Sequence, residues 1–166
     1  MKRSHKISAC VVGGVVLLGA LLISYLLTHE DREVKTRELT SAELAGHLTH
    51  LNPKIRVLAG FEVSEYGGWH GDGGRIMIYL VAPAGMVDLV AGLRRFHEAK
   101  RKEWPNDYQY QWSESPRPDL NGLTRLIPAR FLPPPDVYLI ARNQHGQHTI
   151  SLGQTNGFVC FTDSTF

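Results

Sequence analysis

The sequence of 166 residues contains only two cysteines, Cys10 and Cys160. Cys10 lies in an apolar N-terminal run and Cys160 lies close to the C-terminus, so a disulfide between them within one chain is geometrically implausible. A domain of about 130 residues buries enough apolar surface to fold without disulfides. We therefore expect Cys160, within the segment FVCF, to be a small buried apolar residue.

Asp, Glu, Lys, Arg and His are all absent from residues 7–28, a run of 22 residues. As a helix this run would be about 33 Å long, enough to cross a hydrocarbon core of about 30 Å. A cleaved signal peptide has a shorter apolar core and a small-residue cleavage site, and the run has neither. We therefore expect an uncleaved transmembrane helix in contact with the lipid bilayer. Ala9 and Gly13 are four residues apart, a spacing of small residues that lets two membrane helices approach closely, so the chain could form a homodimer through this helix.

A surplus of either charge is also absent once the N-terminus is set aside. Residues 1–6 hold three of the 18 Lys and Arg residues, which leaves 15 basic against 16 acidic residues in the rest of the chain. Nucleic-acid binding needs a basic surface, so we expect no nucleic-acid partner. The positive residues before the run predict a cytoplasmic tail over 1–6 and an extracytoplasmic C-terminal part.

The remaining chain divides into a linker and one domain. Residues 29–39 are highly charged and predict a solvated linker, and residues 40–166 form the extracytoplasmic domain. Thr40 and Glu43 have the spacing of a capping box, which predicts a short helix that ends before Pro53, near the membrane side of the domain.

Strand patterns predict an antiparallel sheet of about five strands, in a fold of the α+β class. The alternation from Ile55 to Ser64 predicts a half-buried strand with Ile55, Val57, Ala59, Phe61 and Val63 on one side. The segment RIMIYLVAP is apolar on both faces and predicts an interior strand. Three more strand patterns follow near the C-terminus: DVYLIAR, TISLG and FVCFTD. Asn156-Gly157 predicts a hairpin turn of two residues between the last two.

One long helix and one long loop lie between these strands. Residues spaced as on one helical face predict a single packing helix that ends at Pro105: Met86, Leu89, Val90, Leu93 and Phe96. Residues 104–136 hold seven of the nine prolines and predict a long Pro-rich loop, within which DYQYQW resembles a short strand and LNGLTRLI a helical turn.

The stretch GGWHGDGGR, residues 67–75, is the most unusual segment of the domain. A phosphate-binding loop opens a helix, whereas a strand follows here, so a connecting turn is the simpler interpretation. Exposed aromatic residues anchor interfaces. Trp69 with its neighbours His70 and Asp72, together with Trp112 in the Pro-rich loop, are therefore the candidate binding residues.

A metal-dependent hydrolase is the alternative. His145 and His148 flank a predicted turn, and His70 and Asp72 would complete a ligand set if both turns lay at one end of the sheet. No motif indicates a catalytic residue or an organic cofactor, and none links the chain to a family with an assigned activity. The sequence thus favours a single-pass membrane protein that presents a binding domain to a protein or envelope component.

Overall fold

The computed structural model describes residues 18–21, 23–24, 33–48, 51, 54–66, 73–106, 108–118, 120 and 123–165. Most of the apolar run 7–28, including Ala9 and Gly13, lies outside these residues. Among the residues that are described, no helix is long and apolar enough to cross a membrane.

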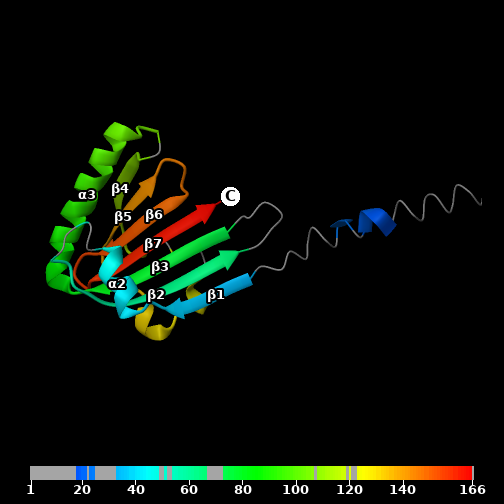
Figure 1. Ribbon diagram of the computed structural model, residues 1–166, viewed down its shortest axis with the longest axis horizontal. Coiled ribbons are helices and arrows are strands. Elements are labelled where there is room, and N and C mark those ends of the chain that lie inside the picture. The colour runs from blue at the N-terminus through cyan, green and yellow to red at the C-terminus, as the bar shows by residue number, and fades with distance from the viewer. Residues whose placement is uncertain are drawn as a thin grey trace, which may run out of the picture.

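A seven-stranded antiparallel sheet forms the centre of the domain, with the strand order β1-β2-β3-β7-β6-β5-β4 (Figure 1). The strands are β1 (Glu33–Glu38), β2 (Val57–Tyr66), β3 (Gly73–Val81), β4 (Tyr110–Ser115), β5 (Tyr138–Asn143), β6 (His148–Gly153) and β7 (Phe158–Thr165). The α+β class and the antiparallel sheet are confirmed. The prediction of about five strands did not include the outermost strand β1, and it gave β4 only as a possible short strand in the segment DYQYQW of the Pro-rich loop.

Strand β1 arises from the segment predicted as a charged linker. All six of its residues are exposed, yet they pair in register with Phe61–Tyr66 of β2. The linker prediction is wrong for residues 33–38 because an edge strand is held by main-chain hydrogen bonds and tolerates charged side chains. Since β1 runs about 20 Å before the next helix begins, that helix starts at the far end of β1 from Glu33. The sequence analysis expected this helix near the membrane side of the domain. In the structure, the length of β1 separates the helix from Glu33, the residue of the domain that follows the N-terminal run.

Two helices, α2 (Ser41–His47) and α3 (Met86–Glu103), pack on one face of the sheet. The capping box of α2 is confirmed, because Thr40 Oγ1 accepts from Glu43 N at 3.4 Å and Glu43 Oε2 accepts from Thr40 N at 2.8 Å. A short 3-10 turn, η1 (Pro83–Gly85), leads into α3. The predicted stripe of α3 buries Leu89 and Leu93, whereas Phe96 at its end is exposed.

The opposite face of the sheet is covered by the Pro-rich region. Two 3-10 turns, η2 (Leu123–Leu126) and η3 (Ala129–Phe131), lie there. Phe131 stacks on Phe61 of β2 with ring centroids 5.3 Å apart, and Cys160 is buried in the same cluster, as the sequence predicts. The region predicted as a long loop therefore supplies both the edge strand β4 and the second layer of the core.

A β-bulge in β2 divides its apolar residues between the two faces. The register shifts between Val57 and Ala59, so Ile55 and Val57 pack towards the helices while Phe61 and Val63 pack towards the η turns. The prediction of a single apolar side is wrong because the bulge inserts one residue and reverses which face the following side chains occupy.

Candidate binding cleft between α3 and the sheet edge

A cleft of about 610 Å³ separates the C-terminal half of α3 from the edge strand β4. Its lining residues come from α3, from the connection to β4, from β4 itself and from the turn after β5: Arg94, His97, Glu98, Arg101, Pro105, Tyr108, Gln109, Tyr110, Gln111, Trp112 and Gln144. The cleft is thus lined by aromatic, amide and charged groups, the side-chain classes that recognise polar partners.

Trp112 is the one predicted binding residue among the residues that the structure describes, and it lies in this cleft. It belongs to strand β4 rather than to a loop, and its ring also packs against the core beneath α3. The guanidinium carbon of Arg94 lies 5.1 Å from the centroid of the Trp112 ring, a cation-π contact between helix and edge strand. The contact orients Arg94 over the floor of the cleft.

His97 was not predicted as a site residue, although it follows Leu93 by one helical turn and so falls on the buried face of α3. Its side chain is 7% exposed, and its Nδ1 atom has no hydrogen-bond partner in the part of the chain that the structure describes. Burial lowers the pKa of His97 to about 4, because the charged ring would lose its hydration. The ring is therefore neutral near pH 7.

The ring of Tyr110 forms the neighbouring part of the cleft. Burial raises the pKa of Tyr110 to about 12, so its hydroxyl stays protonated. With both rings neutral, the ionised groups of the cleft are Arg94 and Arg101 against Glu98. The cleft carries a small positive excess that suits a partner with acidic groups.

The other predicted site residues are only partly covered by the structure. Trp69, His70 and Asp72 lie outside the described residues. The strand ends on either side of them are described. Tyr66 lies opposite Glu33 and Gly73 lies opposite Thr165, at the same end of the sheet as the turn between β5 and β6. Strand β7 separates the two connections in the sheet order.

The two histidines of that turn do not share a ligand position. His148 Nδ1 lies 2.8 Å from Asp163 Oδ1 of β7, whereas His145 is exposed with its Nε2 3.0 Å from Gln144 Nε2. Over the described residues, no group of three or more His, Cys, Asp or Glu side chains is placed to hold a metal ion. Of the predicted metal ligands that the structure describes, His148 is paired with Asp163, which was not in the predicted set, and His145 is not part of that pair.

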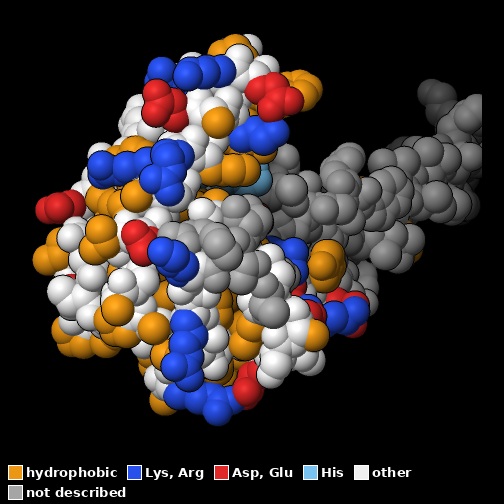
Figure 2. Space-filling view, turned by 60° about the vertical axis from the view of Figure 1, so that its left-hand side comes forward, with side chains coloured by type: hydrophobic (Ala, Val, Ile, Leu, Met, Phe, Trp, Pro, Cys, Tyr) orange, Lys and Arg blue, Asp and Glu red, His pale blue; other side chains and the backbone are white. Residues whose placement is uncertain are grey.

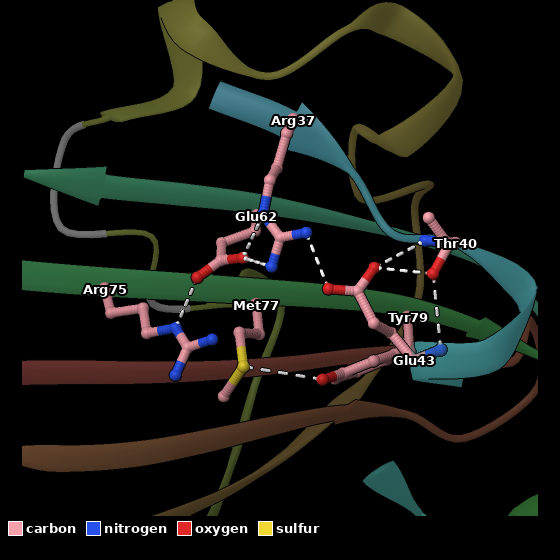
Figure 3. A network of polar contacts seen from close by, with 7 residues as sticks. All are labelled: Arg37, Thr40, Glu43, Glu62, Arg75, Met77 and Tyr79. Atoms are coloured by element: carbon pink, nitrogen blue, oxygen red, sulfur yellow. Dashed lines mark hydrogen bonds and ion pairs between the residues drawn. The ribbon is translucent and has the colours of Figure 1, made fainter. Parts of the chain in front are cut away.

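A second polar cluster lies on the helix-bearing face, near the opposite edge of the sheet (Figure 3). Glu62 is 5% exposed, and its carboxylate accepts from Arg37 Nε at 2.8 Å and from Arg75 Nε at 2.6 Å. Arg37 Nη1 also donates to Glu43 Oε1 at 2.6 Å. Hydrogen bonds from Thr40 and Arg37 lower the pKa of Glu43 to about 2. These charges compensate one another, so the cluster connects β1, β2, β3 and α2 rather than offering charge to a ligand.

Sequence reasoning missed the Glu62 cluster, and only the alternation of β2 gives a signal for it. A carboxylate in the middle of a buried strand requires cationic partners, but their positions depend on strand pairing.

No protein-family model matches the chain, and no curated protein or solved structure matches it either.

Proposed function

We propose that the protein is a single-pass membrane protein whose domain binds a protein or envelope component through the cleft between α3 and β4. Residues 7–28 anchor it, residues 1–6 stay in the cytoplasm and the domain is extracytoplasmic. The observation that carries the binding proposal is the cleft itself, in which Arg94 of α3 lies beside Trp112 and Tyr110 of β4, a strand that no described strand pairs with on its outer side.

The position of the cleft supports a partner near the bilayer. Four residues, 29–32, separate the proposed anchor from Glu33, the first residue of β1. Tyr110 begins β4 opposite Asn143, the last residue of β5, at the end of the sheet that also holds Glu33. The proposed anchor and this end of the cleft therefore lie at the same end of the sheet, at its two opposite edges, about 30 Å apart across six strand spacings.

Site-directed photo-cross-linking in intact membranes tests the proposal. A photoreactive residue at Gln111, which is exposed and lines the cleft, should give an adduct with a partner. The same residue at Val34, exposed on the opposite edge strand β1, is the matched control. We expect the adduct at Gln111 only, and we expect Arg94→Glu to diminish it. Equal labelling at both positions, or none at Gln111, would reject the cleft as the binding site.

Membrane attachment is tested separately from binding. The full chain should remain with membranes after alkaline extraction, and an externally added protease should remove the domain from intact spheroplasts. Release of the full chain by alkali would reject the anchor, and protection of the domain would reject the proposed orientation.

A further inference from the structure

The outer side of β4 carries main-chain groups that no described strand pairs with. β4 ends the sheet order, with β5 as its neighbour. Gln144 N donates to Gln109 O at 3.0 Å, and antiparallel pairs alternate between bonded and non-bonded positions. The same alternation along β4 directs the N–H and C=O groups of Tyr110, Trp112 and Glu114 away from β5.

The two edges of the sheet differ in how they resist pairing with another strand. β1 has four ionisable residues in six, which is typical of an edge protected from other chains. β4, with the sequence YQWSES, has Glu114 as its one charged residue and contains no proline. β4 is therefore the edge at which a further strand can pair.

The cleft lies beside these outward-facing groups. Tyr110 and Trp112 alternate along β4, and their rings contact His97 and Arg94 of α3. In a strand added to β4, alternate side chains would point into the space between β4 and α3, because successive strand residues face opposite sides. The arrangement matches peptide recognition by strand addition, in which main-chain bonds give affinity and side-chain pockets give specificity.

The charges beside β4 indicate which segment fits. Arg94 and Arg101 of α3 outnumber Glu98 in the cleft, and Arg117 and Arg142 line a depression of about 490 Å³ on the other side of β4. Figure 2 brings the α3 side forward and shows groups of Lys and Arg side chains among hydrophobic ones there. A second copy paired through β4 would place these arginines near their own equivalents, whereas acidic side chains would neutralise them.

We infer that β4 receives an extended, acidic segment of a partner protein, which adds to the sheet as its eighth strand with acidic side chains directed at Arg94 and Arg101. The inference rests on the proposed function and specifies its partner. The main chain of Tyr110, Trp112 and Glu114 forms the new strand pairing, and the cleft holds alternate side chains of the segment.

The test uses the full chain in detergent micelles and three short labelled peptides. The first alternates Val and Glu, the second replaces Glu by Lys, and the third is the Val/Glu peptide with an N-methyl group on every backbone nitrogen, so that neither of its edges can donate to β4. Fluorescence anisotropy measures binding, and NMR hydrogen exchange measures protection of individual backbone N–H groups. We expect the Val/Glu peptide alone to bind and to slow exchange at Tyr110, Trp112 and Glu114.

Two pairs of variants connect the binding to charge and to main-chain pairing. Arg94→Gln with Arg101→Gln should weaken binding by about tenfold or more, whereas Arg95→Gln with Lys102→Gln, on the same helix but outside the cleft lining, should not. Glu114→Pro removes one outward N–H and should abolish protection, whereas Glu114→Ala keeps that N–H and should retain binding.

Several results would overturn the inference. They are the absence of Val/Glu binding, equal binding of the Lys or N-methylated peptides, and protection elsewhere than β4. If the β4 N–H groups were protected from exchange in the absence of peptide, and this protection increased with protein concentration, the occupant would instead be a second copy of the chain. A cross-link at Gln111 in membranes together with any of these results would retain the proposed function and reject strand addition. Loss of that cross-link would reject the proposed function itself.

Discussion

The ring of His97 on α3 lies parallel to the ring of Tyr110 on β4, with centroids 3.8 Å apart and 7° between the planes. This stack joins the long helix to the edge strand of the sheet across 13 residues of chain. It also forms one wall of the cleft, so the stability of the cleft depends on the protonation state of a histidine.

The stability of the domain should fall in acid through His97. Its pKa is about 4 when folded and about 6.5 when unfolded, so the unfolded state takes up the proton first as the pH falls. The His97 contribution is complete above about pH 6.5 and is lost progressively towards pH 4, with a total change of about 3 kcal/mol. His97→Phe keeps the ring stack and removes the titration. Urea unfolding at several pH values from 7 to 4.5 measures the free energy of unfolding of both proteins. As the pH falls, the wild type should lose stability relative to the variant. A difference between the two that does not change with pH would contradict the assignment to His97.

Loss of the buried carboxylate of Glu62 should loosen β1. Glu62→Gln removes the negative partner of Arg37 and Arg75, with an expected loss of about 2 kcal/mol in the free energy of unfolding. Glu33→Gln makes the same change in an exposed ion pair with Lys35 and should cost less than about 0.5 kcal/mol. Hydrogen exchange of the β1 amides should accelerate in the Glu62 variant alone. Similar effects of both variants would show that burial of Glu62 contributes little.

Two glycines with positive φ should differ sharply when replaced by alanine. Gly157 has φ +74°, and a Cβ there would lie 1.9 Å from the carbonyl oxygen of Val81, so the β6–β7 connection would have to move. Gly146 has φ +70° but open space around the same position. Gly146→Ala should cost about 1–2 kcal/mol from backbone conformation alone, and Gly157→Ala should cost several kcal/mol more. Thermal unfolding of the two variants measures the difference, and equal costs would contradict the close approach of Gly157 to β3.

The Pro-rich region should contribute to the core. Phe131 is 1% exposed and stacks on Phe61, so Phe131→Ala should reduce the free energy of unfolding by about 3–5 kcal/mol. Leu132→Ala, at the adjacent residue that is 38% exposed, is the control and should cost less than about 1 kcal/mol. A small effect at Phe131 would show that this region is not a layer of the fold.

Local sequence patterns correctly predicted the helices and strands whose formation depends on residues close together in the chain. The capping box at Thr40 and Glu43, the buried face of α3 and the doubly apolar strand β3 are all present where the sequence predicts them. Each depends on the period of a helix or a strand, which a few consecutive residues establish. The Asn156-Gly157 signal also marks a real connection, although it contains residues 154–157 rather than two residues.

Tertiary structure decided the two edge strands and most of the candidate site. β1 is too charged, and β4 too close to prolines, for a local pattern to identify them with certainty, and pairing with β2 and β5 fixes both. The stack of His97 on Tyr110, the pair of His148 with Asp163 and the position of Trp112 under Arg94 likewise depend on segments distant in the chain. Periodicity reports which side chains of one segment share a face; only the order and register of the strands decide which faces of different segments meet.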